Sequence, residues 1–239
     1  MLSIYSILRR RSAATKLARV FERSEASTGR ALPIRKTGRG IWAATPVRVI
    51  EAAVKRLHGI GLLGDAGPPG HVIDAGTGDG RVSAVLAARD PSRVVYGFET
   101  DTALYAQAVA NLHALEADGR IDAAQLHLLE ADYCDVRSYE RGGIALSQTA
   151  VVFNYPDGNE RQLARFVAQH CGPQTTLCLL THNRTLALDE LPRRACHDVS
   201  DGTGPRWRLS LYSRSTAGVS TTSSSAPASG GAPSGAPFD

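Results

Sequence analysis

The chain has 239 residues, 43% of them hydrophobic, and a formal net charge of +4. This length suits one α/β domain with a sizeable core, and no apolar run approaches the ~20 residues that span a bilayer. Residues 1–40 hold ten Lys or Arg against two acids, so the rest of the chain is mildly acidic and a basic groove for nucleic acid is not supported. The four cysteines lack CxxC spacing, which favours reduced thiols over a metal site or a disulfide framework.

Residues 1–40 are predicted to form a basic N-terminal extension, either a helix or loose arm ahead of the domain or a mitochondrial-type transit peptide. Residues 41–63 have helical periodicity, with Thr45 as the expected N-cap and Pro46 in the first turn. The tail 215–239 is rich in Ser, Thr, Ala, Gly and Pro, a composition typical of disorder. The domain is therefore expected to span residues 41–214.

Strand and helix patterns alternate through that domain. The expected strands are 71–75, 93–98, 125–129, 149–153 and 175–181, and the expected helices are 81–89, 102–117 and 160–170. This alternation predicts right-handed βαβ units in a mainly parallel sheet with helices on both faces, an α/β, Rossmann-like fold. Residues 207–212 alternate weakly and are expected to add an antiparallel edge strand near the C-terminus.

A glycine-rich loop follows the first of these strands and opens the first of these helices. It reads Asp74-Ala-Gly76-Thr77-Gly78-Asp79-Gly80, with three glycines at alternate positions that let the backbone turn tightly and approach a ligand closely. The dinucleotide form, GxGxxG, rests a pyrophosphate on the helix N-terminus. Here an acid precedes the first glycine and Asp79 adds a second negative charge, which disfavours a pyrophosphate and suits the ammonium group of a methionine moiety.

This D-x-G-x-G-x-G string resembles motif I of the class I methyltransferases that use S-adenosylmethionine (SAM). The resemblance implies SAM as the cofactor and strand order as in that class over roughly residues 41–212. Methyl transfer from a sulfonium needs no metal, and the sequence offers no cluster of metal ligands, so no metal site is expected. With the Thr45-Pro46 helix upstream, the string also looks like small lysine-directed methyltransferases, and it is equally compatible with small-molecule enzymes.

Acids at the ends of the next two strands extend the expected cofactor site. Glu99 lies nineteen residues after Gly80 and could accept hydrogen bonds from the ribose hydroxyls of an adenosine, with Thr100 beside it. NAD enzymes share this feature, so Glu99 indicates adenosine and not SAM alone. The family resemblance implies that Asp132 contacts the adenine amino group and that Tyr133 or Ala131 lines the ring.

The expected reacting end follows the fourth strand, at Asn154-Tyr-Pro-Asp157. The segment resembles in part the [DN]PP[YF] motif of amino-directed methyltransferases, which implies that Asn154 lies beside the methyl group and holds the target nitrogen. Asp157 is expected to be a base or, alternatively, the N-cap of the next helix. His182 ends the fifth strand and could be a general base or a solvated loop residue. Trp42 could cover the pocket or belong to the core.

Taken together, these features predict methyl transfer from SAM to a nitrogen, rather than an oxygen or carbon, of a protein side chain or small molecule. Nucleic acid ranks behind both because the body is acidic. Two alternatives stay open, a non-catalytic SAM-binding partner protein and an NAD(P)-dependent oxidoreductase. A cytoplasmic location is expected, with the mitochondrial matrix as the alternative.

Overall fold

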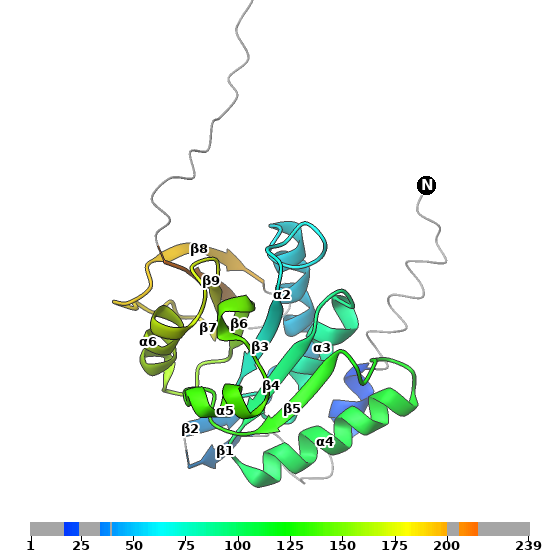
Figure 1. Ribbon diagram of the computed structural model, residues 1–239. Coiled ribbons are helices and arrows are strands. Elements are labelled where there is room, and N and C mark those ends of the chain that lie inside the picture. Colours follow the sequence, from blue (N-terminus) through cyan, green and yellow to red (C-terminus); the bar gives the residue numbers. More distant parts are fainter. Residues whose placement is uncertain (1–16, 24–33, 39, 200–205, 215–239) are drawn as a thin grey trace, which may run out of the picture.

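The computed structural model describes residues 17–23, 34–38, 40–199 and 206–214, and Figure 1 shows their arrangement. A seven-stranded sheet has the order β5-β4-β3-β6-β7-β9-β8. Its strands are β3 (His71–Ala75), β4 (Val95–Glu99), β5 (Leu126–Glu130), β6 (Thr149–Asn154), β7 (Thr176–His182), β8 (Arg193–Asp198) and β9 (Trp207–Tyr212). β3 to β7 are parallel, whereas β9 pairs antiparallel with both β7 and β8. The predicted α/β, Rossmann-like fold is confirmed.

Helices cover both faces of the sheet. They are α2 (Val47–Gly59), α3 (Arg81–Arg89), α4 (Thr102–Ala117), α5 (Val136–Arg141) and α6 (Glu160–His170). One core packs α2, α3 and α4 against the sheet, and the buried side chains of residues 17–23 join it. The other core packs α5 and α6 against the opposite face. The molecule therefore has three layers, and part of the segment expected to be an extension packs against the domain through Leu17, Val20 and Phe21.

The first predicted helix, over residues 41–63, needs correction at both ends, because α2 begins only at Val47 and already ends at Gly59. Its N-cap is Pro46, with no side-chain capping bond, so the predicted Thr45 cap is wrong. A residue that precedes proline is disfavoured in the helical region, which explains why the helix starts only after Thr45-Pro46. Thr45 is buried, and its carbonyl oxygen accepts a hydrogen bond from Arg81.

Residues 41–43, predicted as helix, instead belong to a strand. β1 (Ile34–Thr37) and β2 (Gly40–Ala43) pair antiparallel as a hairpin that is separate from the main sheet. Each strand has only four residues, too few for a clear alternation of apolar and polar side chains. The hairpin crosses the boundary expected at residue 40.

The C-terminal part of the sheet also differs in detail from the prediction. β9 matches the predicted strand, but it lies between β7 and β8 and is not the edge. The edge strand β8 reads RRACHD, and mainly exposed polar residues gave it no apolar pattern. The short helix α5 was also not predicted. The predicted tail 215–239 lies outside the described residues, and among the described helices none has the length and apolar character needed to cross a membrane.

Candidate functional site

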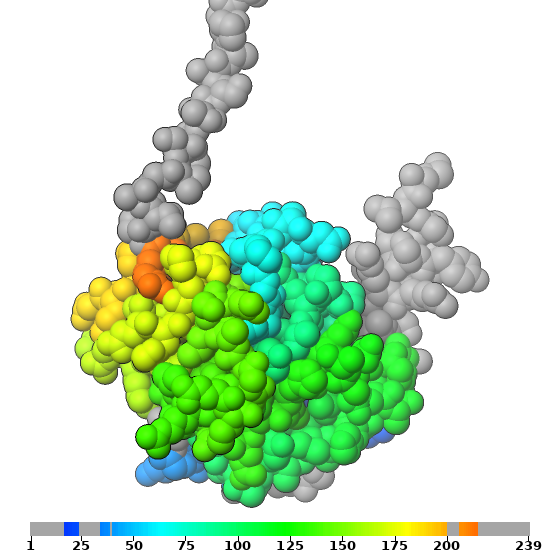
Figure 2. Space-filling model, viewed as in Figure 1, coloured from blue at the N-terminus to red at the C-terminus, as the bar shows by residue number. Residues whose placement is uncertain are grey.

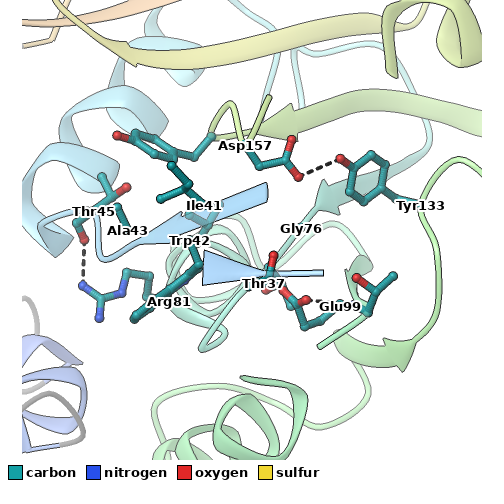
Figure 3. Close-up of a pocket in the computed structure, with 14 residues that line it drawn as sticks. Thr37, Ile41, Trp42, Ala43, Thr45, Gly76, Arg81, Glu99, Tyr133 and Asp157 are labelled. Carbon is teal, nitrogen blue, oxygen red and sulfur yellow. Dashed lines mark hydrogen bonds between the residues drawn. The ribbon is translucent and has the colours of Figure 1, made fainter. Parts of the chain in front are cut away.

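A cavity lies at the carboxyl ends of β3, β4 and β6, beneath the β1–β2 hairpin (Figure 3). In this sheet order, β3 and β6 flank the point where the chain reverses direction across the sheet, which is where open α/β sheets bind ligands. Six predicted site residues are among the described residues that line it, namely Gly76, Thr77, Glu99, Thr100, Tyr133 and Asp157. The other lining residues are Thr37, Ile41, Trp42, Ala43, Thr45, Arg81, Val82 and Tyr155.

The glycine-rich loop turns sharply between β3 and α3. The backbone N–H groups of Gly76 and Thr77 both donate to the carbonyl oxygen of Phe98, at 3.0 and 2.8 Å. Gly78 has a φ of 60° and Gly80 a φ of 86°, in the left-handed region that glycine adopts most readily. A Cβ on Gly78 would lie 2.0 Å from Nε1 of Trp42, so this glycine is required for the close approach of the indole. Gly78 and Gly80 thus shape the loop from outside the cavity lining.

Asp74, expected to face a methionine ammonium group, lies elsewhere. It is buried and accepts a hydrogen bond of 2.6 Å from the Ser83 hydroxyl, which also bonds Thr77 at 2.7 Å. Burial raises the pKa of Asp74 to about 6, although the hydroxyl hydrogen bonds act in the opposite direction. Asp74 is not among the described residues that line the cavity, so it joins the loop to α3 rather than contacting a ligand there.

Glu99 reaches the cavity from the end of β4 while supporting the loop. Its Oε2 accepts the N–H of Gly78 at 2.9 Å, and its Oε1 accepts the N–H groups of Thr100 and Asp101, both at 2.8 Å. Burial raises its pKa, and these backbone donors partly offset the effect. A carboxylate offers about four acceptor positions. Glu99 therefore retains room for about one ribose hydroxyl, rather than the two that the sequence suggested.

The second expected charge of the loop, on Asp79, is neutralised by Arg81. The guanidinium contacts both carboxylate oxygens, with Nε 2.9 Å from Oδ1 and Nη2 2.6 Å from Oδ2, and both residues are buried. Its Nη1 donates to the carbonyl oxygen of Thr45 at 2.9 Å. Its Cζ lies 5.4 Å from the ring centre of Phe21 and 6.0 Å from that of Trp42. Asp79 is thus the partner in a structural ion pair, and because its charge is neutralised it does not by itself disfavour a phosphate at the loop.

Asn154 ends β6 beside the glycine loop. Its Nδ2 donates to the carbonyl oxygen of Ala75 at 2.6 Å. Its Oδ1 is buried and has no hydrogen-bond partner among the described residues. A buried amide oxygen without a donor is costly, so an unpaired one beside a ligand cavity is a candidate acceptor for a substrate N–H.

Asp157 faces the same place from the loop after β6. Its Oδ2 accepts the Tyr133 hydroxyl at 2.8 Å and lies 3.9 Å from the position of a Cβ on Gly76. Its Oδ1 accepts the N–H of Asn159 at 3.0 Å. The N-cap of α6 is Asn159, so the alternative role of Asp157 as that cap is wrong. The negative charge next to the loop therefore comes from Asp157 and not from Asp74.

Asp132 and His182, like Asp74, Gly78, Gly80 and Asn154, are not among the described residues that line the cavity. Asp132 closes a turn by accepting the N–H of Cys134 at 2.8 Å, and it does not line the described cavity. His182 is exposed at the end of β7, with its ring centre 5.4 Å from that of Trp207. Trp207 in turn lies 6.0 Å from Tyr155, which does line the cavity. Trp207 thus connects His182 to the lining residue Tyr155 through two ring contacts.

The lining residues that sequence reasoning missed come from the hairpin, from the start of α3, and from Thr45 and Tyr155. Thr37, Ile41 and Ala43 were not predicted, although the turn-rich stretch after Thr37 between two short β-type segments was a usable hairpin signal. Arg81 and Val82, at the start of α3, directly follow the glycine motif and could have been included on that ground. The predicted absence of a metal site stays a prediction, although no cluster of metal-ligating side chains occurs in the described part of the chain.

The described fold matches solved methyltransferases. Two structures of the rRNA methyltransferase aviRa from Streptomyces viridochromogenes superpose with TM-scores of 0.54 and 0.53, at 18% and 17% identity. They cover 74% and 72% of this chain and 88% and 86% of theirs. A predicted O-methyltransferase from Agrobacterium tumefaciens has a TM-score of 0.49 at 16% identity, covering 71% of this chain and 81% of its own. Neither a family model nor a curated protein matches the sequence. The chain shares the Rossmann-like fold of class I SAM-dependent methyltransferases.

Proposed function

We propose that this protein transfers a methyl group from SAM to an amino nitrogen. The observation that carries the proposal is the buried, unpaired Oδ1 of Asn154, whose Nδ2 lies 3.8 Å from the Cβ position of Gly76, a residue that lines the cavity. A substrate N–H would satisfy this oxygen, and an acceptor held there would lie close to the loop. The target is a protein side chain or a small molecule.

The lining residues fit SAM. Glu99 and Thr100 offer acceptors for an adenosine ribose, and Gly76 leaves room for the backbone to approach the ligand. Asp157 places a carboxylate beside the loop, where it would attract the positive charges of the methionine part. When bound, SAM supplies an electrophilic methyl group on a sulfonium.

Catalysis then depends on what the chain holds in place. In an in-line displacement, alignment of nucleophile and methyl group can contribute ~7–11 kcal/mol. Asn154 would orient the amine through Oδ1, with its own position fixed by the bond to the Ala75 carbonyl. Asp157, oriented by Tyr133 and the Asn159 backbone, is positioned to accept a proton from the amine.

An NAD(P)-dependent oxidoreductase is disfavoured by Asp157. A pyrophosphate resting on the loop at Gly76 would face this carboxylate, whose Oδ2 lies 3.9 Å from the Cβ position of Gly76. Arg81 does not offer a compensating free charge, because it already contacts both oxygens of Asp79. A non-catalytic SAM-binding protein would keep the same cavity, and only a transfer assay distinguishes it.

The test is incubation with methyl-labelled SAM and a desalted lysate, with and without a small-molecule extract. The label is then separated into protein, nucleic-acid and small-molecule fractions. We expect incorporation into protein or small molecules, retained by Arg165→Ala on the remote surface and reduced at least tenfold by Asn154→Ala. The nucleic-acid arm tests the substrate type of the rRNA methyltransferase that shares the fold. SAM binding without transfer into any fraction would favour the non-catalytic alternative.

A further inference from the structure

We propose that the β1–β2 hairpin is a clamp over the cofactor cavity. In it, Trp42 covers the glycine loop, and the ion pair between Arg35 and Asp101 keeps the hairpin closed until the cofactor is exchanged. This inference rests on the cofactor-binding part of the proposed function. The hairpin would be the movable wall of a site whose other residues are positioned by the main sheet.

One face of the hairpin bridges the two sides of the cavity. Directly opposed residues of an antiparallel pair share a face, and the register opposes Arg35 to Trp42 and Thr37 to Gly40. On the side of β4, Arg35 Nη2 lies 3.2 Å from Oδ1 of Asp101, the N-cap of α4. On the side of β6, a Cβ on Gly40 would lie 2.0 Å from the carbonyl oxygen of Asp157.

Trp42 lies between these two contacts, against the glycine loop. The closeness of its Nε1 to Gly78 leaves no space between the indole and the loop backbone. In Figure 3 the hairpin crosses in front of the loop, with Trp42 on the same side as Arg81. Contacts at both sides and in the middle make the hairpin the outer wall of the cavity.

The cavity is too small in this closed arrangement for a nucleoside with a methionine tail. Its volume in this arrangement is about 50 Å³. Clefts for ligands of drug-like size measure ~300–1,000 Å³. One wall must therefore move to admit the cofactor. Apart from the hairpin, the lining comes from the glycine loop, the start of α3 and the segments that follow β4, β5 and β6.

The hairpin is the wall best suited to move. It pairs with no other strand in the described part of the chain, and an isolated two-stranded hairpin has little stability of its own. Ile34 and Ile41 are 52% and 57% exposed, although Ile41 also borders the cavity, so much of the apolar surface of the hairpin is not packed against the domain. In Figure 2 the blue hairpin forms a lower edge of the surface rather than part of its centre.

The base of the hairpin is tethered by a buried hydrogen bond. Directly after β2, the Thr45 carbonyl accepts the hydrogen bond from Arg81, which is fixed in turn by Asp79. Arg81 also packs on Trp42, which links the position of the indole to the loop. The clamp is thus tethered at residue 45 and closes at Arg35.

A closing ion pair makes a distinctive kinetic prediction. Arg35 and Asp101 contact each other, and neither is among the described residues that line the cavity, so their pair should stabilise the closed hairpin with and without ligand. Its loss should raise the association and dissociation rates together by about two- to fivefold, the range for an exposed pair, and leave Kd unchanged within about twofold.

The chain has two tryptophans, Trp42 and Trp207. The experiment therefore uses the full chain with Trp207→Phe, so that all tryptophan fluorescence comes from Trp42. S-adenosylhomocysteine, the demethylated product, is the probe, with calorimetry for Kd and stopped-flow Trp42 fluorescence for the rates. Arg35→Ala is compared with Arg165→Ala, which removes a surface pair 3.7 Å long with Glu190 on another part of the molecule. Raising the ionic strength should accelerate both rates in the parent, and less so in Arg35→Ala.

Parallel acceleration in Arg35→Ala alone, with a change in Trp42 emission on binding, supports the clamp. Binding heat without any change in Trp42 emission overturns it, as does an effect of Arg35→Ala confined to the dissociation rate, or none. Absence of binding heat in the parent protein overturns the proposed cofactor itself, and the clamp with it. The two failures are therefore distinguishable.

Discussion

The indole nitrogen of Trp42 lies 2.0 Å from the position that a Cβ would occupy on Gly78. Two segments more than thirty residues apart in the chain are therefore fitted to each other at the level of single atoms. The contact joins the hairpin to the glycine loop. The position of the Trp42 indole therefore depends on the absence of a side chain at Gly78.

Gly78→Ala should destabilise the protein and displace Trp42. The φ of 60° at this position adds strain of about 1 kcal/mol for a non-glycine residue, and the clash with the indole adds to it. We expect that adding Trp42→Ala to Gly78→Ala restores the part of the unfolding free energy lost to the clash, but not the part lost to backbone strain. A double-mutant cycle by urea unfolding measures this coupling, and additive effects of the two changes would contradict the fit.

Glu99→Ala should lower the affinity for S-adenosylhomocysteine at least tenfold. Loss of one charged hydrogen bond to the ribose is worth ~1.5–3 kcal/mol, and three backbone N–H groups also lose their acceptor. Calorimetry measures the affinity, and thermal unfolding shows whether the variant has also lost stability because the backbone N–H groups at the loop have no acceptor.

The matched control for Glu99 is Glu130→Ala. Glu130 is the register partner of Glu99 on β5, is exposed, and does not line the described cavity. Unchanged affinity in Glu99→Ala would remove the ribose assignment. A loss in both variants would point to the strand ends rather than the carboxylate.

Arg81→Met should destabilise the fold by ~3–5 kcal/mol, because it leaves the buried carboxylate of Asp79 without a partner. Adding Asp79→Asn to Arg81→Met removes that charge and should recover part of the loss. Arg165→Ala, on the exposed surface, is expected to change stability by less than ~1 kcal/mol. Urea unfolding compares the four proteins, and a double variant no more stable than Arg81→Met would show that packing, not charge, dominates.

Asp74 should make stability fall as pH rises. Its pKa of about 6 in the folded protein exceeds the ordinary value of 3.8, so the folded state binds its proton more tightly. The contribution is most favourable below pH 4, decreases between pH 4 and 6, and is constant above. Asp74→Asn keeps an oxygen for Ser83 and removes this dependence.

We therefore expect Asp74→Asn to stabilise the protein at pH 8 by about 1–3 kcal/mol relative to its effect near pH 4. Urea midpoints at the two pH values measure the difference. The control is Asp118→Asn, an exposed carboxylate at the end of α4. An equal effect of Asp74→Asn at both pH values would show that the buried carboxylate carries no net cost.

The local sequence determined the order of strands and helices and the position of the cofactor loop. Alternating apolar runs set the parallel strands, and Asp74 to Gly80 placed the loop between β3 and α3. These features depend on backbone geometry and on residues close together in the sequence, so the sequence alone predicts them. The hairpin and β8 were missed because short or mainly polar strands show little periodicity.

Only the tertiary structure decided which acids and aromatics face the cavity. Asp74 accepts a hydrogen bond from Ser83, and Asp157 is the carboxylate that lies beside the glycine loop. Asp79 was neutralised by Arg81, and Trp42 was laid over Gly78 by a hairpin. Each outcome depends on the direction of a side chain relative to elements distant in the chain, and burial and charge pairing across those elements set it.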